Sequence, residues 1–581
     1  MKILFLCSGF NGLTQRAWLE LDRLNHQVMI SVSEQPEQME QQVEVYQPDL
    51  IVSPYLKAKI PASIWQQYTC LIVHPGIPGD RGASSLDWAI LNDTERWGVT
   101  ILQAVEKMDA GPVWSYRLFD RPQVSKACLY RHEVTQAAAE ALIEAVQRFE
   151  SSEYTPVNAD QLGLTELGIY RKKLEKDKVP VDWTLPATAL LKKCLSADSA
   201  PGLLVDLNQQ SYFAYGGHLE EQLKGQAGTI LARKAEAICV ACGEHALWFT
   251  HLKSLDANAI KLPASKVLKD QLDQVPHLPS DPFEQAQKVT YQDIQCNIEG
   301  DIAFLHFDFY NGAMGTSQCR RLLATIQAAK TRAVRMLVLM GGHDLWSNGI
   351  DLNVIEAAED PAKAAWENIN AIDDLIREII LSTDHYMLNA LQGNAGAGGV
   401  AFALSGDKVM ARKGIVLNPH TQNMGLYGSE YWTYLLPKRI GKEKAEKFTT
   451  ACLPWGTTIA KEIGLIDECF GHTAASFRRG VYQVAKGIRA LPYFEKLIRA
   501  KQLQRQKDER IKPLESYREE ELKRMWANFF ENDQGFHEKR YRFVHKLPPE
   551  NLEHLSRDWY SSRREIYRKR KWESIAYQKQ S

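Results

Sequence analysis

The chain has 581 residues, 45% of them hydrophobic and 24% charged. This composition is that of a folded protein of roughly three to five domains, and it excludes a disordered, fibrous or disulfide-stapled chain. The 70 Lys and Arg residues nearly cancel the 71 Asp and Glu residues, so the molecule has no net field that would attract nucleic acid or an anionic membrane.

Residues 1–160 alternate short apolar strands with helical stretches. We expect strands at residues 3–6, 28–32, 50–53 and 70–73, because each is a short apolar run between polar or amphipathic segments. This alternation predicts a Rossmann-like, mainly parallel sheet covered by helices, within a multidomain α/β protein.

Residues 161–275 change to short strands separated by Gly and Pro turns, among them Pro201-Gly202 and Gly216-Gly217. The pattern predicts a small, OB-like β-barrel domain. Three prolines between Val275 and Pro282 disfavour regular strand pairing. Residues 276–285 are therefore the expected linker.

After the linker, residues 286–490 again alternate strands and helices, with strands expected at 302–307, 334–340 and 387–391. A second α/β domain is predicted there. Residues 491–581 are helical in pattern and heavily charged, which indicates a helical carboxyl-terminal extension.

The ten cysteines are scattered along the chain, which favours reduced thiols over a disulfide framework. Cys239 and Cys242 have metal-binding spacing, but they lie in an apolar run without a second Cys or His pair. A buried strand is therefore predicted there, and no metal site. The apolar start at residues 3–7 is too short for a signal peptide, and no run of about 18 apolar residues occurs. We expect a cytoplasmic protein that does not bind membranes.

The first chemical motif follows the strand at 70–73. His74 should stand at the carboxyl end of that strand, where open α/β sheets bind ligands, and a turn-rich segment, Pro75–Ala83, comes next. Asp109 falls in a later turn, Met108-Asp-Ala-Gly-Pro112. The plain alternative is that His74 and Asp109 only shape turns.

These residues resemble the motifs of the folate-dependent formyltransferases: Asn-x-His, Pro-x-x-Arg-Gly, Gly-Val-Thr and Asp-x-Gly. The resemblance implies 10-formyl-tetrahydrofolate as formyl donor, with His74 stabilising the oxyanion and Asp109 handling protons. The motif's Asn position holds Ile72, which has no side-chain donor, and Asn11 is the expected substitute. The loop Pro54–Pro61 matches the pterin-binding region. Its candidate folate contacts are Tyr55, Leu56 and Ile60.

A second motif pair lies in the later α/β domain. Ser347-Asn-Gly-Ile-Asp351 and Gly393-Asn-Ala-Gly-Ala-Gly-Gly399 resemble the two oxyanion-hole turns of the crotonase (enoyl-CoA hydratase/isomerase) superfamily. The resemblance implies that the backbone N–H groups of Ile350 and Gly398 polarise a thioester carbonyl. The alternative is that these glycines only allow close helix packing.

Hydratase chemistry does not transfer, because Ala401 and Leu417 stand at or near the positions of the two hydratase carboxylates. A polar run from Asn418 to Trp432 follows. Its Glu430 is the candidate acid/base, with Tyr427 and His420 as assistants. Glu430 could equally compensate the dipole of a helix amino terminus.

The two modules in one chain resemble a family of [NiFe]-hydrogenase maturation factors. The resemblance implies formyl transfer from 10-formyl-tetrahydrofolate to coenzyme A, then decarbonylation of formyl-CoA to CO, with hydrogenase accessory proteins as further partners. Coenzyme A phosphates need cations; the candidates are Arg131, Arg542, Arg320 and Arg321. Two alternatives stay open: formyl transfer to another amine with an acyl-CoA-binding second module, or a non-catalytic assembly scaffold.

Overall fold

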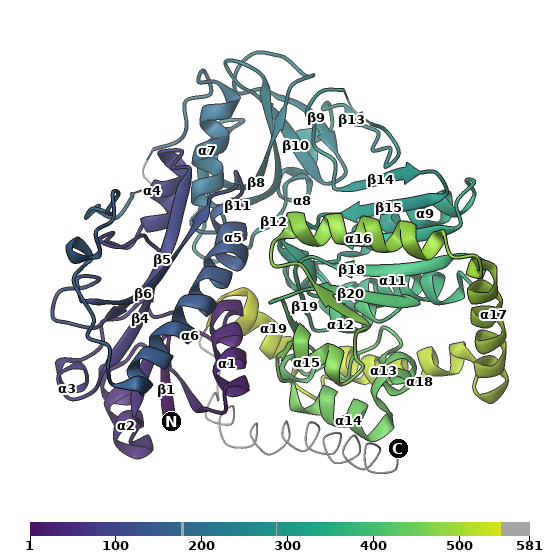
Figure 1. Cartoon of the computed structure of the whole chain (residues 1–581). Coiled ribbons are helices and arrows are strands. Elements are labelled where there is room, and N and C mark those ends of the chain that lie inside the picture. Colours follow the sequence, from purple (N-terminus) through teal and green to yellow (C-terminus); the bar gives the residue numbers. More distant parts are fainter. Residues whose placement is uncertain (176–178, 286, 548–581) are drawn as a thin grey trace, which may run out of the picture. The chain divides into compact units, whose positions relative to one another are not determined.

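The computed structural model describes residues 1–175, 179–285 and 287–547 (Figure 1). The chain divides into two compact units. Among the described residues, the first comprises Met1–Leu278 and Lys288–Tyr291, and the second comprises Pro279–Gln287 and 292–547. The last part of the expected extension, residues 548–581, lies outside the described residues.

The first unit begins with a six-stranded sheet in the order β2-β1-β3-β4-β5-β6. Strands β1 to β4 are parallel, and β5 and β6 continue the sheet in antiparallel pairing. The strands are β1 (Lys2–Cys7), β2 (Gln27–Val32), β3 (Leu50–Ser53), β4 (Cys70–His74), β5 (Arg96–Gln103) and β6 (Val113–Asp120). The four strands predicted before residue 74 are confirmed, and the carboxyl ends of β1, β3 and β4 share one edge.

Helices cover this sheet, as the alternating pattern predicts (Figure 1). They are α1 (Gly12–Arg23), α2 (Pro36–Tyr46), α3 (Ala62–Trp65), α4 (Ser85–Leu91), α5 (Lys126–Leu129), the π-helix η1 (Tyr130–Val134) and α6 (Thr135–Ser151). Helix α1 begins where Asn11 caps it, since the Asn11 Oδ1 accepts from the Thr14 N–H at 3.0 Å. An Asn cap of this kind satisfies one of the free donors of the first turn.

The β-rich part of the first unit is a seven-stranded sheet, in the order β13-β9-β10-β11-β8-β7 with β12 paired to β11. Its elements are α7 (Ala187–Ala197), β7 (Leu203–Leu207), β8 (Gln210–Glu220), β9 (Ile230–Lys234), β10 (Ala237–Ala241), β11 (Ala246–Ser254), β12 (Leu262–Pro263), α8 (Ala264–Leu268) and β13 (His277–Leu278). Cys239 lies in β10 and Cys242 directly follows it, and both are buried. The strand interpretation of this Cys pair is therefore confirmed, and burial raises the pKa of the Cys242 thiol to about 12.

The expected linker contains β13, which pairs in parallel with β9. The prolines were expected to prevent such pairing. Only Pro276 and Pro279 flank the strand, however, and His277 and Leu278 keep the backbone donors that a ladder needs.

The second unit has two sheets. The larger runs in the order β14-β15-β16-β18-β20-β23 and the smaller in the order β17-β19-β21-β22. The larger sheet consists of β14 (Ile294–Glu299), β15 (Ile302–Phe307), β16 (Met336–Gly341), β18 (Tyr386–Leu391), β20 (Lys408–Arg412) and β23 (Glu468–Phe470). The smaller consists of β17 (Leu345–Ser347), β19 (Asn394–Gly396), β21 (Val416–Asn418) and β22 (Trp455–Gly456).

The helices of the second unit cover both faces of the larger sheet (Figure 1). They are α9 (Thr316–Lys330), α10 (Leu352–Glu356), α11 (Pro361–Leu381), α12 (Gly399–Ala403), α13 (Trp432–Ile440), α14 (Lys442–Ala451), α15 (Thr457–Glu462), α16 (Ala474–Arg489), α17 (Phe494–Ile511), α18 (Leu514–Trp526) and α19 (Phe536–Val544). Successive strand residues point to opposite faces. Leu337 and Leu339 accordingly pack with α9 and α11, whereas Met336 and Val338 pack with α16 and α17.

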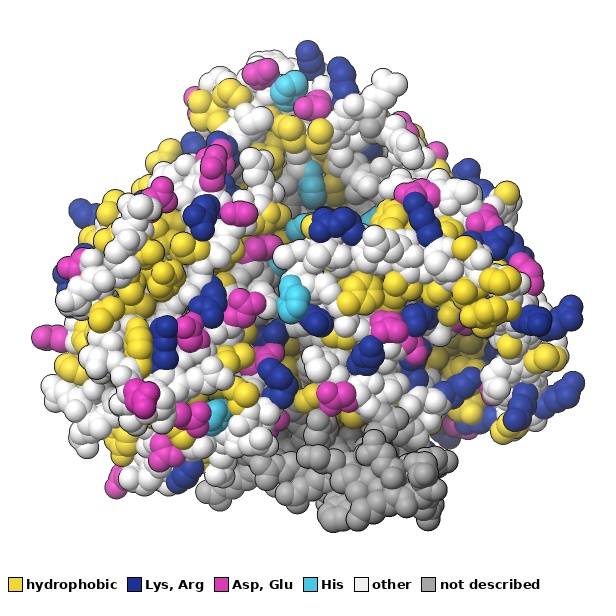
Figure 2. All heavy atoms as spheres, in the orientation of Figure 1, with side chains coloured by type: hydrophobic (Ala, Val, Ile, Leu, Met, Phe, Trp, Pro, Cys, Tyr) yellow, Lys and Arg dark blue, Asp and Glu magenta, His cyan; other side chains and the backbone are white. Residues whose placement is uncertain are grey.

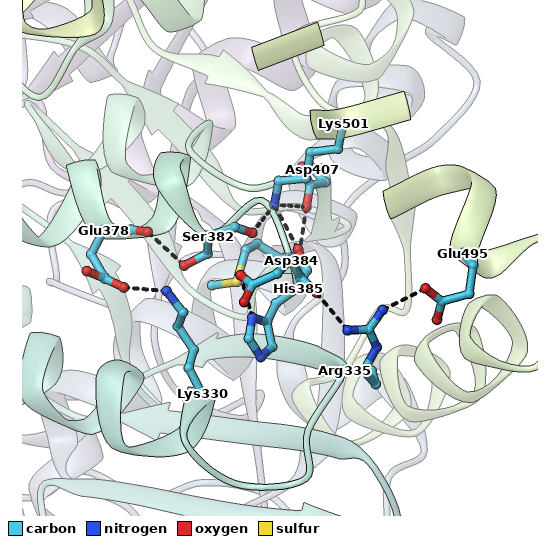
Figure 3. A network of polar contacts seen from close by, with 10 residues as sticks. Lys330, Arg335, Glu378, Ser382, Asp384, His385, Asp407, Glu495 and Lys501 are labelled. Carbon is cyan, nitrogen blue, oxygen red and sulfur yellow. Dashed lines mark hydrogen bonds and ion pairs between the residues drawn. The ribbon is translucent and has the colours of Figure 1, made fainter. Parts of the chain in front are cut away.

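Lys501 anchors the carboxyl-terminal extension to the core (Figure 3). Its ammonium donates to the Asp407 carboxylate at 2.7 Å and to the carbonyls of Ser382 at 2.8 Å and His385 at 2.9 Å. Burial lowers the pKa of Lys501 and raises that of Asp407. The attraction between the two charges offsets the cost of removing them from water. The pair thereby fixes α17 against the turn between α11 and β18.

Lys and Arg side chains lie interspersed with Asp and Glu over the face shown in Figure 2, in keeping with the balanced composition. Within the three described stretches, no helix has both the length and the apolar character that crossing a bilayer would require.

Candidate active sites

The predicted first site centres on His74, the last residue of β4, which is 4% exposed. Its Nε2 lies 3.0 Å from Oδ2 of Asp80, and its Nδ1 lies 3.7 Å from Oδ1 of Asp109. The structure therefore brings the two predicted residues together and adds a second carboxylate. Asp109 also accepts from the Gly82 N–H at 3.3 Å and has a φ of 54°, so its turn is held against the Arg81-Gly82 loop.

Asp80 is the residue that sequence reasoning missed at this site. Its carboxylate accepts from the Ser85 hydroxyl and lies 3.4 Å from the Arg171 guanidinium. It is 2% exposed, so its charge is compensated by these partners and by His74. Buried carboxylates need such partners.

The loop after β4 leaves little room for variation. A Cβ on Gly76 would stand 2.5 Å from both the Asp80 Oδ2 and the His74 Nε2. The loop is held from β5, because Thr100 donates to the Gly76 carbonyl at 2.8 Å and Trp97 to the Pro75 carbonyl at 3.0 Å. Glycine is required at position 76 because the His–Asp pair occupies the space of a side chain.

Asn11 belongs to a neighbouring cluster. Its amide nitrogen donates to the Tyr130 hydroxyl at 3.4 Å, and the Tyr130 ring meets that of Tyr55 edge to face at 6.2 Å. Burial raises the pKa of Tyr130, so its hydroxyl stays neutral. The hydrogen bonds and ion pairs of the described part of the chain join His74 to Asp80 and Asp109, not to Asn11. The role of Asn11 as a replacement donor remains a prediction.

The predicted folate loop follows β3. The Tyr55 carbonyl accepts from the Ser8 N–H at 2.7 Å, which ties the loop to the end of β1. Tyr55 is half-buried, Leu56 packs on the sheet's apolar core, and Ile60 is 3% exposed within that core. Tyr55 thus presents its ring beside Asn11, whereas Ile60 is mainly a core residue.

The four candidate phosphate-binding arginines lie in different settings. Arg131 is in η1 of the first unit, and Arg542 is in α19 of the second. Arg320 is exposed on α9. Arg321 forms a bidentate ion pair with Asp293 at 2.8 and 2.7 Å. A structural role therefore fits Arg321 better than the expected role in phosphate binding.

The second site is built on the two predicted turns. Strand β17 pairs in parallel with β19, so the turns that follow both strands lie at one edge. They face each other, since a Cβ on Gly349 would stand 3.5 Å from the Gly398 amide nitrogen. Within the described residues, no protein acceptor takes the N–H of Ile350 or Gly398. Two free donors at one point are what an oxyanion hole requires.

A small pocket opens beside Gly398. Its volume is about 20 Å³, enough for roughly one water-sized group. Its lining residues are Ala397, Gly398, Val400, Ala401, Pro419, Thr421, Gly428, Ser429, Glu430, Trp432, Leu436 and Thr449. Ala401 lies in the pocket wall, whereas Leu417 belongs to the hydrophobic core. A one-carbon acyl group suits this space better than a long acyl chain.

Glu430 is the carboxylate of this pocket. It is 4% exposed, and a Cβ on Gly398 would overlap its carboxyl group. Burial, reinforced by the nearby Asp373, raises the pKa of Glu430 to about 8. Its Oε2 accepts from the Ser429 N–H at 2.9 Å. An acid with a pKa near neutrality is suited to proton transfer.

The dipole-compensation alternative for Glu430 is wrong. Helix α13 begins at Trp432, and it is Glu521 of α18 that accepts from the N–H groups of Tyr431 and Thr433, at 2.9 and 2.8 Å. Glu430 precedes the helix with a φ of 64°, and Tyr431 has a φ of 57°. Each left-handed residue costs about 1–2 kcal/mol. Asp373 and Glu521 hold this turn, and sequence reasoning missed both.

The two expected assistants differ in position. His420 Cε1 would lie 3.2 Å from a Cβ on Gly396, and Nδ1 donates to the Asn418 carbonyl at 2.8 Å. Burial lowers the pKa of His420, so Nε2 is unprotonated. Tyr427 instead packs against Trp432, with ring centroids 5.4 Å apart, and is not among the residues that line the pocket.

Three known protein families match successive parts of this chain. Formyl transferase matches residues 15–144, the formyl transferase carboxyl-terminal domain matches residues 173–266, and enoyl-CoA hydratase/isomerase matches residues 313–551. Methionyl-tRNA formyltransferase of Hahella chejuensis is 26% identical over 221 residues, covering 37% of this chain and 68% of that protein.

Two relatives match nearly the whole chain. Hydrogenase maturation factor HoxX of Bradyrhizobium diazoefficiens is 41% identical over 550 residues, covering 94% of this chain and 95% of that protein. A crystal structure of HypX from Aquifex aeolicus in complex with tetrahydrofolic acid has a TM-score of 0.92 and 42% identity, covering 96% of this chain and 98% of that chain.

Proposed function

Since the chain belongs to the HoxX/HypX family of hydrogenase maturation factors, we propose that it makes carbon monoxide for a [NiFe]-hydrogenase. Its formyltransferase and crotonase-family domains support an enzyme, to which we assign two reactions. The observation that carries the proposal is the Glu430 carboxyl, placed over Gly398 beside two free amide donors.

The first reaction moves a formyl group from N10 of 10-formyl-tetrahydrofolate to the thiol of coenzyme A. A C–N bond breaks, a C–S bond forms, and the thiol proton ends on N10. His74 holds the developing oxyanion, and Asp80 and Asp109 hold the imidazole from its two nitrogens. The folate complex of the HypX relative supports this donor. Tyr55 and Leu56 are the proposed folate contacts, with Asn11 as a further donor.

The second reaction releases CO from formyl-CoA. The N–H groups of Ile350 and Gly398 polarise the thioester carbonyl, and Glu430 removes the formyl proton. The C–S bonding pair leaves on sulfur, CO departs, and Glu430 returns the proton to the thiolate. The products are CO and coenzyme A, so atoms and charge balance. His420 and Tyr427 remain secondary candidates.

Coenzyme A is proposed from the crotonase fold and from the chemistry of the pocket. Its phosphates need cations, and Arg131 and Arg542 are the proposed ones, each within its own unit. All ten cysteines are free thiols, which supports a reducing, cytoplasmic setting. Hydrogenase accessory proteins are the proposed recipients of the gas.

The test mixes purified protein, 10-formyl-tetrahydrofolate and coenzyme A, and follows CO with a haem reporter. Wild-type protein should give one CO per formyl-folate consumed. Glu430→Gln should still deformylate the folate when coenzyme A is present but should accumulate formyl-CoA. Glu446→Gln, on an exposed part of α14, is the matched control. CO release by Glu430→Gln at the wild-type rate would refute the assignment.

A further inference from the structure

Three carboxyl groups meet around one turn in the interior of the second unit. Asp373 of α11 and Glu521 of α18 are fully buried, at 0% exposure, and Glu430 is 4% exposed. Asp373 and Glu521 do not line the pocket. Carboxylates are rarely fully buried, because they lose their hydration. The position of these two behind a proposed catalytic acid therefore calls for a functional explanation.

Asp373 and Glu521 bind the turn from two sides. Oδ1 of Asp373 accepts from the Glu430 N–H at 2.9 Å, and Oδ2 accepts from the Ser429 hydroxyl at 2.7 Å. Glu521 accepts from the N–H groups of Tyr431 and Thr433 and from the Thr433 hydroxyl. These bonds satisfy the N–H groups of the left-handed pair itself, Glu430 and Tyr431, and that of Thr433, and so determine where the Glu430 carboxyl points.

We propose that Asp373 and Glu521 are positioning residues for the decarbonylation, holding the Ser429–Tyr431 turn so that the Glu430 carboxyl stands over Gly398 and sharing protons with it. This inference rests on the proposed function of Glu430. Neither residue touches the pocket, so both act through Glu430 and through the backbone of the turn.

The charged groups around Glu430 come from several elements. Asp373 of α11 and Glu521 of α18 face it, and so does the thiol of Cys319 on α9, whose pKa is raised by burial and by Glu430. Arg518 of α18 is the cation nearest to Asp373, with 4.0 Å between Nε and Oδ2, and Asp374 lies beside it. One guanidinium cannot compensate three buried carboxylates, so protons remain bound within the cluster.

The raised pKa values within the cluster suit a carboxyl group that takes up a proton and then returns it. Burial raises the pKa of Asp373 to about 7 and that of Glu521 well above its ordinary value. The negative charge of Asp373 in turn disfavours ionised Glu430. The pKa of Glu430 is thereby brought close to that of a free thiol, which is about 8.5. Proton transfer between groups of matched pKa needs little driving force.

The experiment compares Asp373→Asn and Glu521→Gln with the wild type, with formyl-CoA as substrate. Asp373→Asn removes the charge but keeps an oxygen for the Glu430 N–H, and its NH2 group can donate to the Ser429 hydroxyl. Glu521→Gln removes the charge and also leaves one of the two backbone N–H groups that Glu521 holds without an acceptor. In Asp373→Asn, the rising limb of the pH profile for kcat should move to lower pH by about one unit, because a like charge is lost. Glu521→Gln should move it in the same direction. Glu367→Gln and Glu519→Gln, on exposed parts of the same two helices, should leave it in place.

Asp373→Ala separates geometry from charge. It removes the acceptor of the Glu430 N–H, so kcat should fall at least tenfold while KM changes little. Asp373→Asn should retain most of the plateau rate. A pH profile for Asp373→Asn that superposes on that of Glu367→Gln would overturn the proposal, as would an Asp373→Ala variant with wild-type kcat.

A second readout keeps the inference separate from the proposed function. Infrared difference titration of the substrate-free protein reports the Glu430 carboxyl band, identified by its loss in Glu430→Gln. In Asp373→Asn this band should titrate at lower pH. A wild-type protein that releases no CO would refute the function, while the infrared shift would still show the coupling. An unmoved band would refute the coupling even if CO is made.

Discussion

The carboxyl group of Glu430 occupies the space that a side chain on Gly398 would fill, so the proposed acid and the proposed oxyanion-hole residue depend on each other. Gly398→Ala should therefore displace Glu430 and reduce CO release from formyl-CoA by about a hundredfold or more. Transfer of formyl from folate to coenzyme A should continue. Gly487→Ala is the matched control, because a Cβ there meets nothing within 4 Å. Equal loss in both variants would contradict the prediction.

Formyl transfer should depend on Asp80 as well as on the predicted pair. Asp80→Asn keeps the shape but removes the carboxylate that orients His74 through its Nε2. We expect a loss on the order of a hundredfold in folate deformylation, by analogy with a carboxylate that orients a catalytic His. CO release from added formyl-CoA should not change. Asp120→Asn is the control, since its side chain is 98% exposed. An Asp80→Asn variant with full transfer activity would show that the pair is only structural.

Thermal stability should fall as pH rises through the range in which the carboxyl cluster loses its protons. The pKa of Glu430 in the folded protein, about 8, lies above its ordinary value of 4.5. The folded state therefore binds a proton that the unfolded chain releases. This contribution is complete below about pH 4.5 and is lost as the pH approaches 8. It amounts to a few kcal/mol, to order of magnitude.

Calorimetry between about pH 5 and 8, the range over which this linkage acts, checks whether stability falls as the pH rises. Glu430→Gln should lose less stability over that range than the wild type, because the Gln side chain does not titrate. A wild-type Tm that rises between these limits while that of the variant stays level would contradict the linkage.

Removing the ammonium that fixes α17 should destabilise the second unit. Lys501→Met leaves Asp407 buried without its cation and leaves two carbonyls without a donor. Breaking a buried pair in this way costs about 3–5 kcal/mol. Urea denaturation measures the loss, with Lys496→Met as the exposed control on the same helix. A Lys501→Met variant as stable as the control would show that water replaces the ammonium.

Much of the fold could be predicted because strand periodicity and turn residues are local signals. His74, Ile350 and Gly398 could be singled out because each lies at or just after the end of a strand and belongs to a motif, and parallel strands bring such turns to one edge. Their chemical roles stay predictions. Asp80 lies inside the same motif, but its loop also contains Arg81, and only the folded loop distinguishes which of them meets His74.

The two carboxylates behind Glu430 differ in how visible they are. Asp373 interrupts the apolar stripe of α11 that includes Ile369, Ile372 and Ile376, and a charge at a core position is a signal that sequence analysis can detect. Glu521 stands in the run Arg518-Glu-Glu-Glu521, which is typical of a solvated helix. Its burial depends on how α18 packs, a tertiary fact that no local pattern records.

Glu521 lies 90 residues after Tyr431, which belongs to the turn that Glu521 holds. A ribosome translating this chain will have completed both sheets of the second unit before it adds the residue that fixes the left-handed pair. Domains fold as units during synthesis, so the proposed release of CO should begin only after α18 has emerged. The order of translation would thereby delay the onset of activity.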